Sequence, residues 1–181
     1  VVRRRGIGTT VSNRKVHRKA TLSSLHDDLL ASGRRPSTTV LELRRGQDVR
    51  AAEALDLPAD AELLAITRLR QADGTPLALL HNWLPPAYAD VTAEELTTGG
   101  LYAALRARGG SPVVARQSVG ARMPTRQERR LLDIRGQHPV LTMTRTVFGP
   151  TGEAVELAEH GITANAVAPG PFGAFNPRRF G

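Results

Sequence analysis

The sequence predicts an α+β fold in which helices pack on one antiparallel sheet. Two pairs of apolar runs are separated by short turns, at Asp73-Gly74 and at Gly149–Gly152. Strands joined by such tight turns must run antiparallel. Other stretches carry apolar residues at helical spacing behind capping residues. The patterns amount to about five or six strands and three or four helices, with no internal repeat.

The central element is residues 61–85, where two apolar runs flank Asp73-Gly74. Alternation along the first strand places Leu64, Ile66, Arg68 and Arg70 on one face. Two guanidinium groups at this spacing can clamp a carboxylate or a phosphate. A solvated strand end, where arginine is common, explains the same residues.

Residues 21–32 predict a helix, because Leu22, Leu25, Leu29 and Leu30 form one apolar stripe. Thr21 or Ser23 can cap its start, and Gly33 can end it. Hydroxyl groups beside unpaired backbone N–H groups favour an anion at this point. Capping alone accounts for the same residues.

The remaining elements follow from the same patterns. Further helices are expected at residues 48–55, 100–109 and 125–134, the last opened by the capping box Thr125…Glu128. Tyr102 lies in the first turn of residues 100–109, a position typical of a core residue with its hydroxyl at the edge. The other expected strands are residues 2–11, 38–43, 113–121, 140–148 and 153–159.

Composition limits the possible functions. The chain has a formal net charge of +8 and no cysteine, which excludes disulfides and thiolate sites. The excess of basic residues lies near the ends, so affinity for nucleic acid would reside in residues 1–20. No run of apolar residues reaches bilayer length and no signal peptide is evident, so a cytoplasmic protein is expected. The sequence contains no nucleophile-elbow, P-loop or zinc-protease motif, and its five histidines are scattered. We therefore expect neither an enzyme nor a bound cofactor or metal.

Several segments together resemble a known family. Residues 2–11, VRRRGIGTTV, resemble the wing strand that ends the winged helix-turn-helix of GntR-type bacterial repressors. Residues 22–43, 66–85, 100–110 and 149–159 resemble the UTRA effector domain of the HutC subgroup. We therefore expect a remnant of the wing at 1–11, a linker at 12–20, a UTRA domain at 21–160 and an atypical tail at 161–181.

The resemblance implies a chorismate lyase-like fold, a homodimer and binding of a small, usually anionic metabolite. It implies that binding reorients DNA-reading heads at the N-terminus, which this chain lacks. DNA would therefore be contacted only through that missing domain, because base-reading needs a recognition helix.

The family's ligand-binding positions fall on six residues here: Ser23, Ser24, Arg68, Arg70, Tyr102 and Glu156. Gly100 replaces the serine that usually precedes the aromatic position, and Leu80 stands where a glutamate is frequent. Leucine cannot accept a hydrogen bond, so the departure at Leu80 disfavours an amino-sugar phosphate. The anion clamp does not depend on that residue.

Residues 161–181 depart from the family, which usually adds another strand there. Residues 165–170, N-A-V-A-P-G, resemble a piece of a short-chain dehydrogenase, yet its Y-x-x-x-K motif and glycine-rich cofactor loop are absent. We expect a loosely held tail without dehydrogenase activity. Loss of the usual last strand would expose an edge of the sheet.

Two other functions remain open at this stage. One is a chorismate lyase-like enzyme on the same fold, against which the wing-like residues 2–11 argue. The other is a nucleic-acid-binding module acting through the basic residues 1–20.

Overall fold

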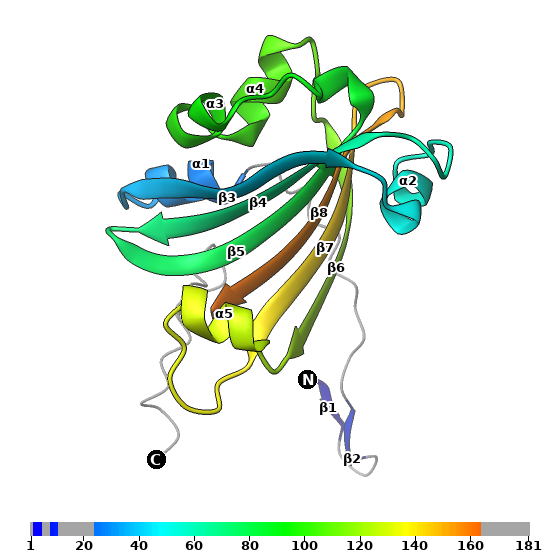
Figure 1. Ribbon diagram of the computed structural model, residues 1–181. Coiled ribbons are helices and arrows are strands. Elements are labelled where there is room, and N and C mark those ends of the chain that lie inside the picture. The colour runs from blue at the N-terminus through cyan, green and yellow to red at the C-terminus, as the bar shows by residue number, and fades with distance from the viewer. Residues whose placement is uncertain (1, 5–7, 11–23, 164–181) are drawn as a thin grey trace.

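A six-stranded antiparallel sheet forms the body of the protein, as the α+β prediction requires (Figure 1). The computed structural model describes residues 2–4, 8–10 and 24–163. The strand order is β3-β4-β5-β8-β7-β6. The strands are β3 (Pro36–Gly46), β4 (Leu63–Ala72), β5 (Thr75–Leu84), β6 (Val114–Arg122), β7 (Val140–Phe148) and β8 (Ala154–Thr163).

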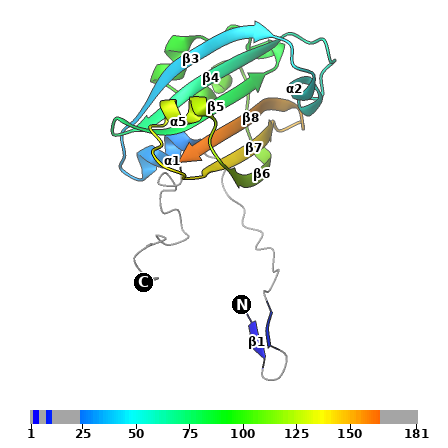
Figure 2. The same cartoon turned by 60° about the horizontal axis from the view of Figure 1, so that its bottom comes forward.

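Helices cover both faces of this sheet (Figures 1 and 2). They are α1 (Leu25–Ala31), α2 (Val49–Ala54), α3 (Ala93–Thr98), α4 (Leu101–Ala107) and α5 (Arg126–Leu131), with a 3-10 turn at Pro86–Tyr88. On one face α4 contributes Leu101 and Leu105 to the main core with Ile66 of β4. On the other face α2 packs near Leu63, and Leu132, which caps α5, packs against Leu79. The described core is therefore divided by the sheet into two layers.

The central hairpin forms as predicted. Asp73 and Gly74 both have positive φ values, 52° and 80°, which is the backbone that a two-residue turn between β4 and β5 requires. Strand β5 ends at Leu84, immediately before Pro85-Pro86, since proline has no N–H to donate to a sheet.

Two helical predictions need correction, and one helix was not predicted. Helix α1 begins at Leu25 and its N-cap is Ser24, not Thr21 or Ser23, both of which lie outside the described residues. The helix expected at residues 100–109 forms as α4, and the unexpected helix α3 precedes it, separated from it by Gly100 with a φ of 76°. Helix α5 keeps its predicted capping box but is shorter than expected, and Asp133 with a φ of 48° turns the chain away.

The two ends of the chain also differ from expectation. Residues 2–11 do not form one strand: β1 (Val2–Arg4) and β2 (Gly8–Thr10) pair with each other. Strand β8 continues to Thr163, beyond the expected boundary at residue 160, and lies between β5 and β7. Within residues 24–163 the sheet edges are therefore β3 and β6, and the last strand is an interior one.

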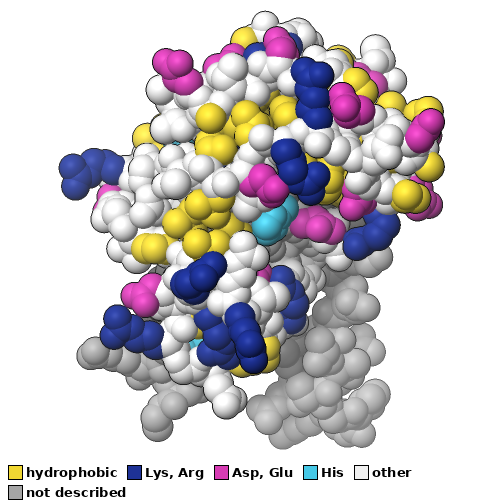
Figure 3. Space-filling view, viewed as in Figure 1, with side chains coloured by type: hydrophobic (Ala, Val, Ile, Leu, Met, Phe, Trp, Pro, Cys, Tyr) yellow, Lys and Arg dark blue, Asp and Glu magenta, His cyan; other side chains and the backbone are white. Residues whose placement is uncertain are grey.

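The face of the molecule seen in Figure 3 carries charged side chains of both signs. Basic side chains gather toward the lower end of that view. The last turn of α5 contains two basic residues, Arg129 and Arg130. Acidic side chains lie over the upper part of the same view.

Candidate functional site

A small cavity of about 100 Å³ lies between the sheet and the N-terminal ends of α1 and α4. Five of the six residues expected to bind a ligand line it: Ser24, Arg68, Arg70, Tyr102 and Glu156. The sixth, Ser23, lies outside the described residues. The cavity therefore gathers residues from α1, α4, β4 and β8 that are far apart in the sequence.

Strand register explains why these side chains meet. Arg68 of β4 pairs with Leu80 of β5, Leu80 pairs with His160 of β8, and His160 pairs with Met143 of β7. Directly paired residues point to the same side of a sheet. This row forms the floor of the cavity, and α1 and α4 form its roof.

Arg68 and Arg70 are both buried, with 3% and 2% of their surface exposed. The interpretation of this segment as a solvated strand end is therefore wrong. Burial lowers the pKa of both guanidinium groups to about 10, although Glu156 opposes the effect at Arg68. Both groups remain cationic at neutral pH, at a cost in stability that exposed arginines do not have.

A buried hydrogen-bond chain holds Arg68. Its Nη2 donates to Asn82 Oδ1 at 2.8 Å, and Asn82 Nδ2 donates to Glu156 Oε1 at 2.6 Å. Burial raises the pKa of Glu156, and the charge of Arg68 works against that rise. Glu156 thus acts through Asn82 as the counter-charge of Arg68 within the protein.

Arg70 has a neutral partner instead. Its Nη1 lies 2.9 Å from His26 Nδ1. A guanidinium group only donates, so the imidazole accepts through Nδ1 and carries its proton on Nε2. Burial, followed by the charge of Arg70, lowers the pKa of His26 and keeps this ring neutral.

A third arginine reaches the cavity from β7. Arg145 Nη1 donates to the Tyr102 hydroxyl at 3.2 Å, and Arg145 Nε donates to Gln117 at 3.2 Å. Burial raises the pKa of Tyr102, so the phenol stays protonated at neutral pH. The cavity wall therefore presents three cations and one buried carboxylate, with the exposed Asp28 at its rim.

Several buried polar atoms at this cavity have no hydrogen-bond partner among the described residues. They are Arg68 Nε, Arg70 Nε, Glu156 Oε2 and His160 Nε2; the other such atom in the described chain is Thr38 Oγ1. An unpaired buried polar group costs roughly 1–3 kcal/mol. Their concentration around one cavity marks it as a place where polar atoms of a ligand can bind.

Ser24 serves first as a helix cap. Its hydroxyl accepts from the Asp27 N–H at 3.2 Å and donates to the Asp27 carboxylate at 2.8 Å. The capping interpretation of this serine is therefore confirmed, and its hydroxyl reaches the cavity only at the rim. Leu80, the residue that stands where the family frequently has a glutamate, is 3% exposed and lies in the floor of the cavity.

Four polar residues around the site were missed at the sequence level: His26, Asn82, Arg145 and His160. His160 lies four residues after Glu156, so strand alternation alone places both on one face. Arg145 alternates with Thr144 and Thr146, and the same rule assigns it to the opposite face from them. The turn at Gly149–Gly152 signals the pairing of β7 with β8, but the pairing of β8 with β5, which brings these faces together, has no local signal in the sequence.

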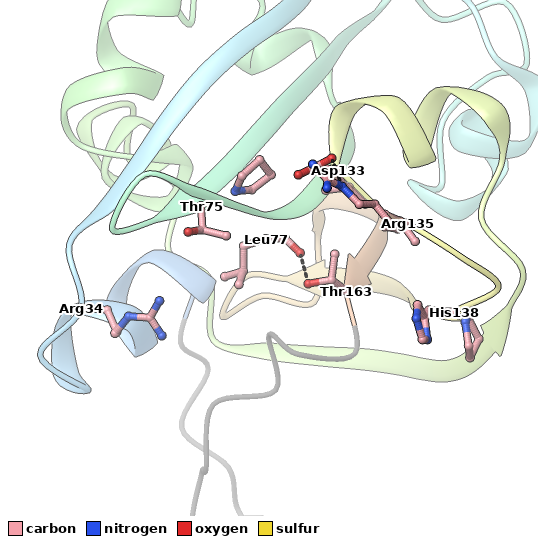
Figure 4. Close-up of a pocket in the computed structure, with 11 residues that line it drawn as sticks. Arg34, Thr75, Leu77, Asp133, Arg135, His138 and Thr163 are labelled. Carbon is pink, nitrogen blue, oxygen red and sulfur yellow. Dashed lines mark hydrogen bonds and ion pairs between the residues drawn. The ribbon is translucent and has the colours of Figure 1, made fainter. Parts of the chain in front are cut away.

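A larger cavity of about 520 Å³ lies beside the start of β5 and the end of β8 (Figure 4). It lies between the C-terminal end of α5 and the starts of β3 and β5, and none of the six expected residues lines it. Its charged groups have partners: Arg34 pairs with Asp73, and Arg135 lies 3.5 Å from Asp133. The larger cavity thus lacks the buried arginines Arg68 and Arg70, whose Nε atoms have no partner among the described residues.

The described residues hold no group of three or more histidine, cysteine, aspartate or glutamate side chains placed to bind a metal ion. None of the described helices has the length and apolar character needed to cross a bilayer.

The UTRA domain model matches residues 31–167 of this chain. Among solved structures, a protein from Streptomyces coelicolor assigned as a transcriptional regulator is 40% identical, with a TM-score of 0.69; the match covers 75% of this chain and 91% of that one. The ligand-binding domain of a protein from Bordetella bronchiseptica assigned to the GntR-family transcriptional regulators is 23% identical, with a TM-score of 0.68. That match covers 72% of this chain and 86% of the Bordetella chain.

A curated relative of a different kind also matches. The chain is 29% identical over 170 residues to the A-factor type gamma-butyrolactone 1'-reductase (1S-forming) of Streptomyces virginiae. The match covers 92% of this chain, which spans 63% of the length of that reductase. Residues 165–170, likened above to a dehydrogenase segment, lie outside the described residues.

Proposed function

This chain belongs to the UTRA domain family and is an effector-binding domain of a transcriptional regulator, and we propose that its arginine-lined cavity binds a small anionic metabolite. The observation that carries the proposal is Arg70, a buried cation whose direct partner is the neutral imidazole of His26. A buried charge without a counter-charge is costly, and a bound anion removes that cost.

The charge balance of the wall supports the same ligand class. Arg68, Arg70 and Arg145 contribute three positive charges, and Glu156 is the buried carboxylate opposite them. Arginine forks bind phosphate and carboxylate oxygens through paired N–H groups. Arg68 and Arg70 clamp the anion, while Tyr102 and Glu156 orient the rest of the molecule and Ser24 borders the entrance.

Regulation follows from differential affinity. An effector that binds one arrangement of the protein more tightly than another shifts the population toward the first. The segment order described above favours the HutC subgroup of the GntR regulators, in which the readers of DNA precede this domain. Residues 1–11 and 12–20 would then be the wing remnant and the linker through which the shift reaches DNA.

A second copy of the chain is a further proposed partner. Strand β6 is a nine-residue edge strand, and its Val114 and Val119 are 56% and 61% exposed. A long, exposed, apolar edge is a template for pairing with another strand. We expect a homodimer in analytical ultracentrifugation and a monomer for Val119→Lys, because a charge at the edge blocks pairing. An unchanged dimer in that variant would place the interface elsewhere.

The ligand proposal is tested by a thermal-shift screen of sugar phosphates and small organic acids, followed by calorimetry on each compound that stabilises the domain. Arg68→Ala should weaken binding by at least about tenfold, the loss of one charge-assisted contact. Arg135→Ala, at an exposed arginine of the larger cavity, is the matched control and should bind normally. Equal affinity in wild type and Arg68→Ala would remove the clamp from the account.

Two separate assays examine the other functions. Release of an aromatic product from chorismate would identify a lyase, and we expect none. Salt-dependent binding of DNA by this chain alone would assign a nucleic-acid role to residues 1–20, and we expect no detectable binding.

A further inference from the structure

We infer that His160 is a specificity-determining residue of the cavity and that its Nε2 atom hydrogen-bonds an uncharged hydroxyl group of the effector. The inference rests on the proposed anion site and adds a second requirement to the ligand. Nothing in the family's motif assigned a role to this position.

The placement of His160 is central to the argument. It lies in the floor of the cavity on β8, with Leu80 on one side and Met143 on the other. Both neighbours in this row lack a strong hydrogen-bonding group. The nearest row along the sheet contains Asn82, which contacts Arg68 and Glu156, and Arg145, whose contacts include Tyr102, Gln117 and Met143 Sδ.

The Nε2 atom of His160 is buried and has no partner within the described part of the chain. Burial, aided by the charges of Arg145 and Arg68, lowers the pKa of His160, so the ring is neutral. A neutral imidazole nitrogen either donates or accepts, depending on its tautomer. A ligand atom that reaches it can therefore relieve a desolvation cost that the protein bears.

The chemistry of the wall selects the partner group. A cationic group would be repelled by Arg68 and Arg145, which lie on either side. Anionic oxygens are drawn to the guanidinium groups, where they gain charge-assisted hydrogen bonds. A hydroxyl group is uncharged and both donates and accepts, so it satisfies His160 in either tautomer.

The size of the site narrows the class further. A cavity of about 100 Å³ is well below the several hundred Å³ of sites for drug-sized molecules. The inferred effector therefore places a short, hydroxylated segment in the cavity, attached to a phosphate or carboxylate. Short-chain hydroxy acids and hydroxylated phosphate esters have this chemistry.

Three probes separate the two requirements: inorganic phosphate, propyl phosphate and glycerol 3-phosphate, the last being the hydroxylated counterpart of the second. We expect wild-type protein to bind glycerol 3-phosphate about tenfold more tightly than propyl phosphate, the gain of one hydrogen bond to a buried group. In His160→Phe this ratio should fall to about one, while affinity for inorganic phosphate stays unchanged. His160→Gln, which keeps a hydrogen-bonding group, should restore part of the ratio.

The outcomes distinguish the role of His160 from the proposed anion site on which it rests. If all three probes bind and the ratio is near one in wild type, or is unchanged in His160→Phe, the role of His160 is refuted and the anion site stands. If none of the probes binds to wild type, the anion site and the role of His160 fail together. Should His160→Phe fail to fold, the ratio in His160→Gln and the imidazole nitrogen resonances of wild type provide the readout. Those resonances should shift with glycerol 3-phosphate and not with propyl phosphate, and the reverse pattern would refute the inference.

Discussion

Replacing Arg70 with methionine should make the ligand-free domain more stable while removing its affinity for anions. Arg70 is 2% exposed, lies beside the like charge of Arg68 and hydrogen-bonds the neutral His26 Nδ1, while Asp27 offsets part of the cost of its charge. Methionine keeps an unbranched apolar stem in the same space. The substitution therefore removes the buried charge with little loss of packing.

The magnitude follows from the pKa of Arg70, which burial and then Arg68 lower from 12.5 to about 10. This difference corresponds to about 3 kcal/mol of cost for holding the cation in the folded protein. Removing the donor leaves His26 Nδ1 without a partner, which costs about 1 kcal/mol. The net expectation is a gain of about 1–2 kcal/mol in the free energy of unfolding, or about 3–6 °C in Tm.

The assay is thermal and urea unfolding in a buffer free of phosphate and sulfate, since a bound anion would stabilise wild type. Arg68→Met is the matched variant with the opposite expectation. It leaves Glu156 buried without its cation and should destabilise the domain by about 3 kcal/mol. A lower stability for Arg70→Met, or phosphate affinity equal to wild type, would refute the reasoning.

Three further predictions concern the stability of the scaffold. Glu128 is buried, accepts hydrogen bonds from Arg122 at 2.7 and 2.8 Å, and has a pKa lowered from 4.5 to about 2, chiefly by Arg122. A lowered carboxyl pKa stabilises the fold above pH 4.5, so stability should fall between pH 4.5 and 2. Because the Arg122 side chain is 47% exposed and screened by water, we expect a loss of about 1–2 kcal/mol, absent in Glu128→Gln. Gly161→Ala should lower the free energy of unfolding by about 1–3 kcal/mol, because the added Cβ would collide with the Glu128 carboxylate. Urea unfolding measures this loss, and a stability equal to that of wild type would contradict the packing of α5 on β8. Gly100→Ala should cost about 1 kcal/mol through its φ of 76° alone, since the added Cβ meets His26 only at ordinary van der Waals distance. A loss above about 3 kcal/mol would contradict this.

Local signals in the sequence were sufficient for most of the scaffold. The Asp73-Gly74 turn, the Thr125 capping box and the proline stop after Leu84 each depend on a few adjacent residues, and each formed as predicted. The errors occurred where one residue changes the path of the chain. Helix α3, which Gly100 separates from the helix expected at residues 100–109, was not among the expected elements.

The candidate site was predictable to the extent that its residues share a strand. Alternation placed Arg68 and Arg70 on one face, and burial shows that this face is the interior one. Whether that face meets solvent or protein depends on which helices cover it, a long-range property. Asn82, Arg145 and His160 join the cavity only because β8 lies between β5 and β7, and the β5–β8 pairing has no signal in the turns.

The most direct test of the account is the nitrogen–proton NMR signal of the arginine Nε groups during titration with inorganic phosphate. Arg68 Nε and Arg70 Nε are buried and unpaired within the described residues, so both signals should move downfield as phosphate accepts their hydrogen bonds. The signal of the exposed Arg135 serves as the internal control and should not move. Saturable shifts at Arg68 and Arg70 alone are the predicted result. Signals at these two residues that stay unchanged at saturating phosphate would contradict an anion site in this cavity.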